Sequence, residues 1–230
     1  MQYNRFNQPI GESITDFNNP PMPHFSTLTG IYCRLEKFTE HHIDDLYMHF
    51  KEESDAPNWT YLPDDQPQTY IAFKEQFREK ITSKDPYYIA VIDKSSNRAL
   101  GIVSLLRINC NHGTIEVGHI HYSNQLQKSR IATEAQFLLA RHVFDNLGYR
   151  RYEWKCDALN QPSKKAAQRL GFQYEGTFRN HVIYKGRTRD TSWFAMTDSD
   201  WYNIKPFYER WLDPTNFDEE GRQRTTLSIK

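Results

Sequence analysis

The sequence predicts an α/β (α+β) domain in which helices flank a mixed central sheet of six to seven strands. Three strand-like segments between residues 87 and 122 are joined by short turns, which is typical of an antiparallel meander. A helical segment then leads into another strand, and this succession predicts a parallel crossover. Of the 230 residues, 38% are hydrophobic and 14% aromatic, so the chain carries enough apolar side chains for such a core.

The chain divides into an arm, one domain and a tail. Residues 1–29 are polar and contain four prolines, so we expect an N-terminal arm laid over the domain. Residues 30–200 make up the predicted domain, and residues 201–230 a C-terminal helix and tail packed on it.

The domain is predicted to begin with a strand over residues 31–35, where polarity alternates. Thr39 then suits the N-cap of a short helix with one apolar face. A second helix is indicated by apolar residues at helical spacing between Tyr70 and Ile81, and Pro86 closes it.

Strands are expected over residues 87–93, 99–109 and 114–122, and a helix over residues 131–147. Gly148 lies just past that helix, where glycine commonly ends one. The remaining predicted elements are a strand over 152–158, a helix over 162–170 and two strands within 172–198 that turn at Lys185 and Gly186.

The charge balance predicts no nucleic-acid and no membrane partner, because 29 Lys and Arg residues face 29 Asp and Glu residues. The first residues lack an apolar leader, and no apolar run approaches the length of a membrane span, so we expect a cytoplasmic protein. Cys33, Cys110 and Cys156 lie far apart, which is typical of reduced core thiols. The sequence leaves open whether the chain forms a homodimer.

The segment most informative about function lies between the strand over 114–122 and the next helix. Backbone N–H groups at such a turn, with the helix dipole behind them, suit a pyrophosphate, and an ordinary basic turn is the alternative. The candidate binding residues are Gln127, Lys128, Ser129, Arg130, Ile131, Ala132 and Thr133.

This segment resembles the Q/R-x-x-G-x-G/A signature of the GNAT family of N-acetyltransferases. The landmarks that follow also resemble that family, and the resemblance covers most of the chain. They are Glu116-Val117-Gly118-His119, Asn160-Gln161-Pro162-Ser163, Arg169-Leu170-Gly171-Phe172, Glu175-Gly176-Thr177-Phe178-Arg179 and Gly186-Arg187-Thr188-Arg189-Asp190. Together they are similar to the branch of ribosomal-protein N-terminal acetyltransferases named RimJ and RimL.

The resemblance implies the GNAT fold, acetyl-CoA as co-substrate and no metal. It places the pantetheine arm between two splayed parallel strands, with Asn160 ordering that arm. The chain departs from the signature at its first glycine, which is Arg130 here. A guanidinium can pair with phosphate oxygens, so this residue can replace one kind of phosphate contact by another.

Transfer to an amine requires stabilisation of the departing thiolate. Many GNAT proteins place a tyrosine seven residues after the motif asparagine, but that position is Ala167 here. The resemblance therefore implies Ser163 for this role, and a helix-capping role is the alternative.

The amine must also lose a proton. Glu116 is a candidate base, with a strand ion pair as the alternative, and His181 is a second candidate beside Val182, which occupies the usual position of the family's glutamate. Strand alternation puts Glu116 on the face of Ile120, opposite His119 and His121. The two histidines have the spacing of metal ligands but lack a third, so no metal is expected. Cys156 is expected in the core.

The functional hypothesis is acetyl-CoA-dependent transfer of acetyl to a primary amine: a small amine, a polyamine or a protein N-terminus. One alternative is a non-catalytic acyl-CoA-binding regulatory protein with the GNAT fold. Another is a transferase of a longer acyl group such as succinyl. The identity of the acceptor amine stays open.

Overall fold

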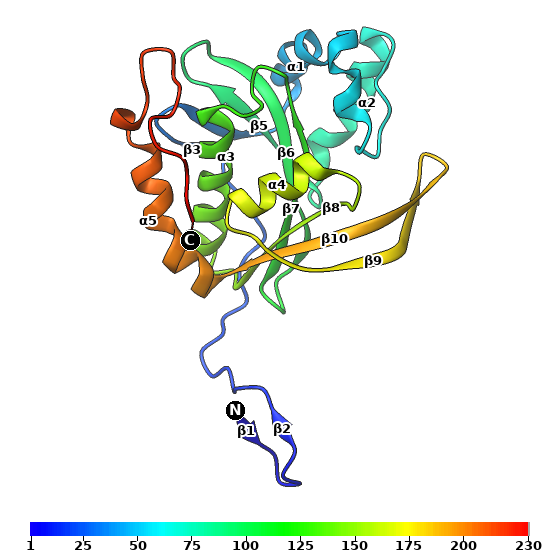
Figure 1. Cartoon of the computed structure of the whole chain (residues 1–230). Coiled ribbons are helices and arrows are strands. Elements are labelled where there is room, and N and C mark those ends of the chain that lie inside the picture. The colour runs from blue at the N-terminus through cyan, green and yellow to red at the C-terminus, as the bar shows by residue number, and fades with distance from the viewer. Residues whose placement is uncertain (230) are drawn as a thin grey trace.

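The computed structural model describes residues 1–229, which form an eight-stranded mixed sheet covered by helices on both faces (Figure 1). The strand order is β3-β4-β5-β6-β7-β8-β10-β9, and only β7 and β8 run parallel. The predicted mixed sheet is confirmed. The bounds are β3 (Thr27–Thr29), β4 (Cys33–Lys37), β5 (Tyr87–Asp93), β6 (Arg98–Asn109), β7 (Thr114–Tyr122), β8 (Arg151–Asp157), β9 (Gln173–Tyr184) and β10 (Arg187–Thr197).

The sheet has one strand more than the largest expected number because the arm contributes β3, which pairs with β4. This strand is three residues long and mostly exposed, so it leaves no hydrophobic pattern in the sequence. Two further short strands, β1 (Gln2–Tyr3) and β2 (Pro9–Ile10), form a hairpin that projects away from the domain (Figure 1).

Five α-helices cover the sheet, and none among residues 1–229 is long and apolar enough to cross a membrane. Helix α3 begins where the Ser129 hydroxyl accepts the N–H of Ala132, and its last turn continues as a π-turn before Gly148, whose φ is 77°. The bounds are α1 (Ile43–Phe50), α2 (Tyr70–Thr82), α3 (Arg130–Arg141), α4 (Gln161–Arg169) and α5 (Asp198–Leu212); short helices are η1 (Glu40–His42), η2 (Glu53–Trp59), η3 (His142–Asn146) and η4 (Pro214–Asn216).

Two apolar cores lie on the two faces of the sheet. The larger joins it to α3, α4 and α5, and Leu138, Ala167 and Trp201 belong to it. The smaller joins it to α1 and α2 through residues such as Phe50 and Phe73. We call these the α3 face and the α1–α2 face. Cys33 and Cys156 are buried on the α3 face, and Cys110 is half-buried; all three are free thiols.

Strands β7 and β8 separate partway along their length. Their parallel ladder runs from Thr114 opposite Arg151 to Val117 opposite Trp154 and stops there, although β7 continues to Tyr122. The ends of both strands are therefore unpaired with each other, which is the splayed arrangement that the family resemblance implies.

A β-bulge in β7 corrects the predicted side-chain alternation. Its pairing with β6 shifts by one residue between Gly118 and His121, and His119 has a φ of 46°. Val117 and Ile120 both pack on the α3 face, so the alternation changes phase between them. His119 and His121 consequently share the α1–α2 face with Glu116, not the opposite face, because the bulge inserts one residue.

Candidate functional site

The loop between β7 and α3 presents unpaired backbone donors at a helix N-terminus. The N–H groups of Lys128, Arg130 and Ile131 make no hydrogen bond with any residue of 1–229, whereas that of Ala132 is taken by Ser129. Lys128 has a φ of 58°, which turns the chain sharply before the helix. Three free N–H groups with the dipole of a twelve-residue helix behind them can bind an anion.

Arg130 is the first residue of α3 and has no positive φ, so this position does not need glycine. Its guanidinium lies over the Tyr32 ring at 4.4 Å and near the Phe217 ring at 5.4 Å. These two aromatic contacts orient the charge beside the loop.

The other candidates in the loop are held by neighbouring elements. The amide of Gln127 donates to Asn58 Oδ1 and to the Tyr122 carbonyl, both at 3.0 Å, and so ties the loop to η2. The Thr133 hydroxyl accepts from Arg169 of α4 at 3.1 Å. The loop therefore joins three elements around the opening between β7 and β8.

Asn160 and Ser163 lie at the start of α4, just past β8. Asn160 is the N-cap, and its Oδ1 accepts the Ser163 N–H at 3.1 Å. The Ser163 side chain does not cap the helix; its Oγ accepts the Trp154 indole N–H at 3.0 Å. Trp154 is the last residue of β8 in the parallel ladder, so the hydroxyl lies beside the point where the strands separate.

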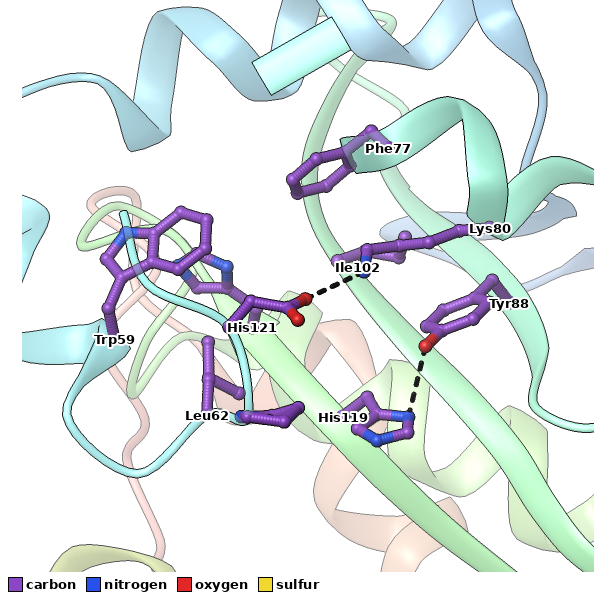
Figure 2. A pocket seen from close by; sticks show the side chains of 10 residues that line it. Trp59, Leu62, Phe77, Lys80, Tyr88, Ile102, His119 and His121 are labelled. Carbon is purple, nitrogen blue, oxygen red and sulfur yellow. Dashed lines mark hydrogen bonds and ion pairs between the residues drawn. The ribbon is translucent and has the colours of Figure 1, made fainter. Parts of the chain in front are cut away.

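A small pocket opens on the α1–α2 face beside the bulge (Figure 2). His119 lies at its base, with Nδ1 at 3.1 Å from Ser104 Oγ and 3.4 Å from Tyr88 Oη. The Gly118 carbonyl also lies 3.1 Å from Ser104 Oγ and can only accept. Donation of the Ser104 proton to this carbonyl leaves Ser104 to accept from Nδ1, and in that tautomer Nε2 keeps the lone pair. The lining residues are Trp59, Leu62, Pro63, Asp64, Phe77, Lys80, Tyr88, Ile102, His119 and His121.

Burial lowers the pKa of His119 to about 4, and the charge of Lys80 acts in the same direction. The charge of Asp64 opposes this, but Lys80 Nζ holds that carboxylate at 2.9 Å. The imidazole is therefore neutral at physiological pH and able to accept a proton.

His121 lines the same pocket, but contacts with neighbouring side chains hold its ring in place. It stacks on Phe50 at 3.6 Å, and Nε2 lies 3.2 Å from an oxygen of Asp55, whose side chain is fully buried. Trp59 Nε1 donates to the same carboxylate at 3.1 Å. Among residues 1–229 there is no group of three or more His, Cys, Asp or Glu side chains able to hold a metal.

Glu116 is 3% exposed, and both of its carboxylate oxygens are held. Arg107 Nη1 donates to both oxygens at 2.8 Å, and Lys155 Nζ lies 2.8 Å from one of them. Glu116 does not line the pocket. This geometry favours the ion-pair interpretation over that of a free base.

His181 lies on β9, within an irregular stretch of the β9–β10 pairing. Its Nδ1 is 3.0 Å from the Thr191 hydroxyl, and Phe178 and Trp193 lie against its ring. It is exposed on the hairpin and does not line the pocket beside the bulge. Val182 follows it on the same strand, with 37% of its surface exposed.

The fold and this site define a GNAT-type acyltransferase, and comparison with known proteins agrees. The model of the "Acetyltransferase (GNAT) domain" family matches residues 33–173, so the chain belongs to the GNAT family. It is therefore an acetyltransferase, and acetyltransferases of this fold use acetyl-CoA.

Among solved structures, a GCN5-related N-acetyltransferase from Brucella melitensis is 42% identical, with 92% of this chain and 96% of that one covered and a TM-score of 0.90. A GNAT-family protein from Chromobacterium violaceum is 34% identical, with 85% and 99% covered and a TM-score of 0.77. The uncharacterized N-acetyltransferase p20 of Bacillus licheniformis is 31% identical over 107 residues; the match spans 46% of this chain and 60% of that relative.

Sequence reasoning missed the pocket residues Tyr88 and Lys80 and the Ser104 hydroxyl that contacts His119, and it considered His119 only as a metal ligand. The strand pattern contains both histidines, but the bulge that turns them toward α1 and α2 depends on tertiary pairing with β6. A positive φ at a histidine is uncommon, so the sequence holds no local signal for it.

Proposed function

We propose that this protein transfers the acetyl group of acetyl-CoA to the primary amine of a small molecule by direct attack. The observation that carries the proposal is the pocket at the β7 bulge, whose residues His119 and His121 lie on the part of β7 that no longer pairs with β8. The loop before α3 is tied to this region because Gln127 donates to Asn58, the residue before the pocket residue Trp59. Three features follow one another along β7 and the loop after it. They are the gap beside β8, the pocket with a neutral base, and the site for an anion.

For acetyl-CoA, the proposed binding residues are those of the loop, residues 127–133, together with Asn160. The N–H groups of Lys128, Arg130 and Ile131 suit the pyrophosphate, and the Lys128 and Arg130 charges add to the attraction. The thioester supplies an activated acetyl group.

Two side chains are proposed to handle the protons. His119 Nε2 accepts the proton that the amine loses, because Ser104 and Tyr88 hold the other ring nitrogen. Ser163 stabilises the departing thiolate, because its hydroxyl lies at the end of the parallel ladder next to Trp154. Glu116 and His181 remain the alternative bases.

The acceptor is proposed to be a small amine because a loop covers the pocket. Leu62, Pro63 and Asp64 of the loop after η2 line the pocket. Lys185 of the β9–β10 turn holds this loop by donating to the Trp59 carbonyl at 2.7 Å and pairing with Asp65 at 3.0 Å. A protein N-terminus, as in the RimJ and RimL branch, needs a groove open at both ends. A cytoplasmic location, the division at residues 29 and 200, and a homodimer remain predictions.

Binding of acetyl-CoA is the experiment that tests this proposal. We expect saturating acetyl-CoA to raise the melting temperature by mass action and to bind in a calorimetric titration. Lys128→Glu should weaken this binding, because it places a negative charge beside the pyrophosphate, whereas Lys164→Glu on α4 offers a comparison of equal charge change. An unchanged melting temperature without heat of binding would refute the assignment.

A non-catalytic acyl-CoA-binding protein is the second candidate. It shares the expected binding but predicts no thiol release with any amine. The neutral, pocket-lining imidazole of His119 favours catalysis over this alternative.

A further inference from the structure

Two imidazoles of β7 line the pocket beside the bulge, and the proposed function gives a role only to that of His119 (Figure 2). The second, that of His121, is 4% exposed and is held in a fixed orientation. Phe50 stacks on the His121 ring at 3.6 Å, and Trp59 meets the ring nearly at right angles at 4.5 Å. The hydrogen bonds of this ring decide whether it can also accept a proton.

Asp55 of η2 fixes the tautomer of His121. Its carboxylate is fully buried and lies 3.2 Å from His121 Nε2. The same carboxylate accepts the Trp59 indole N–H at 3.1 Å and the Asn58 amide N–H at 2.6 Å. Because a carboxylate only accepts, Nε2 of the neutral imidazole carries the hydrogen and Nδ1 keeps the lone pair.

The Nδ1 atom of His121 is free to meet a ligand. It makes no hydrogen bond with any residue of 1–229, and it is not among the buried unpaired atoms of the described chain. Since the other ring nitrogen is held by Asp55, Nδ1 is the atom through which His121 can act in the pocket that it lines.

The charges around His121 come from three elements. Burial lowers the pKa of His121, whereas the hydrogen bond and the charge of Asp55 raise that pKa. Lys80 of α2 lowers it further, Asp64 of the loop after η2 raises it, and His119 is the neighbouring imidazole on the strand. The ring is therefore neutral at physiological pH, and the carboxylate behind it stabilises the imidazolium that forms when Nδ1 takes a proton.

Acetyl transfer removes two protons from the acceptor nitrogen. The amine reaches the site as an ammonium at physiological pH and must lose one proton before its lone pair can attack the thioester. After attack the nitrogen is again positively charged, and it loses a second proton as the amide forms. The pocket thus needs to accept two protons, and two of its side chains each have a free nitrogen.

We propose that the two histidines divide these protons: His121, positioned by Asp55, takes the first from the bound ammonium, and His119 takes the second as the amide forms. This inference rests on the proposed function and adds the proton acceptor that generates the nucleophile. The C–N bond forms as the C–S bond breaks. One proton ends on the departing thiolate and the other in solvent, so both rings are neutral again after each turnover.

The test compares amines of similar shape and different basicity. An accepted amine is paired with its β,β-difluoro analogue, for example phenethylamine with β,β-difluorophenethylamine, because fluorine lowers the ammonium pKa and leaves the analogue largely neutral at pH 8. In His121→Gln we expect kcat/KM at pH 8 to fall roughly a hundredfold for the basic amine. The fluorinated amine should keep nearly its parent value, since its first proton is already absent.

Two further variants separate this role from support of the pocket wall. Asp55→Asn removes the charge behind His121 at nearly equal size and should show the same selective loss for the basic amine. His142→Gln changes a buried histidine of η3 outside the pocket and should leave kcat/KM of both amines near the parent values. Melting temperatures of all variants report any general loss of stability.

A second readout uses the parent protein and so does not depend on the folding of a variant. If His121 removes the first proton, kcat/KM of the basic amine stays level between pH 7 and 9, where that amine is mostly ammonium. If the protein used only the neutral amine, kcat/KM would rise about tenfold per pH unit over this range.

Such a rise in the parent protein, equal losses for both amines in His121→Gln, or parent values for both amines in that variant would overturn the division between the histidines. Failure of the proposed function gives a different result, in which acetyl-CoA does not bind and no amine of either kind releases thiol.

Discussion

At the scale of single residues, the chemistry depends on side chains whose partners fix their state. Ser104 and Tyr88 leave His119 with a lone pair on Nε2, whereas Arg107 and Lys155 occupy the oxygens of Glu116. His119 and Glu116 lie on the same strand, but only His119 has an atom free to accept a proton.

This difference predicts the pH profile. Burial lowers the pKa of His119 to about 4, so the neutral base is present above that pH and activity is lost as the pH falls through it. We expect His119→Gln to lower kcat/KM at pH 7 by about a hundredfold and to remove the acid limb near pH 4. The Glu116→Gln variant should retain the acid limb. If Glu116→Gln loses the acid limb and His119→Gln retains it, the base is Glu116.

Ser163 has a structural partner as well as a proposed role. Ser163→Ala leaves the Trp154 N–H without an acceptor, which should cost about 1–3 kcal/mol of unfolding free energy. If the hydroxyl also stabilises the thiolate, kcat falls while the affinity for acetyl-CoA stays near that of the parent protein. Melting temperature and kcat measured on one preparation separate the two effects, and a destabilised variant with full kcat would exclude the catalytic role.

At the scale of elements, one buried carboxylate joins the helix of the cofactor loop to the sheet. Glu134 of α3 accepts the N–H groups of Ile31, Tyr32 and Cys33 at 2.5–2.7 Å, where β4 begins. A side chain at Gly30 would collide with that carboxylate, which explains the glycine. Apolar periodicity predicted the helix, but nothing in the sequence indicated that an acidic residue on its buried side accepts the N–H groups where a strand begins.

Glu134→Gln tests this junction. The amide offers one acceptor oxygen and brings two donors against three N–H groups, so we expect a loss of about 3 kcal/mol or more in unfolding free energy. Chemical denaturation measures this loss of unfolding free energy, and the Glu75→Gln variant, at an exposed position of α2, is the matched control. Equal midpoints for the two variants would show that the N–H groups find other acceptors.

The β9–β10 hairpin is the second element that serves the site. Its turn fastens the loop over the pocket through Lys185, which contacts Trp59 and Asp65. Lys185→Gln should raise KM for the amine several-fold and speed amide hydrogen exchange in residues 59–65, without a change in acetyl-CoA affinity. Unchanged exchange in that loop would mean that it is held without Lys185, by the Lys80–Asp64 ion pair and by the Gln66 amide, which donates to the Phe50 and Glu52 carbonyls.

At the scale of the whole molecule, the sequence predicted the order of elements and the mixed sheet because strong periodicity marks most of them. It did not predict β3, which lacks a pattern, or the phase change in β7, which arises from pairing with β6. The loop at 127–133 was found through its place between strand and helix. The pocket was not predicted, because its residues come from η2, the loop after it, α2, β5, β6 and β7.

Amine-dependent release of free thiol from acetyl-CoA tests the central claim most directly. The assay uses the full chain, saturating acetyl-CoA and a panel of amines that includes amino acids, their decarboxylated counterparts, polyamines and a peptide with a free N-terminus. We predict thiol release with at least one small amine, with an equal amount of acetylated amine detected by mass spectrometry, and rates of both about a hundredfold lower in His119→Gln. Binding of acetyl-CoA without thiol release for any amine would contradict the account.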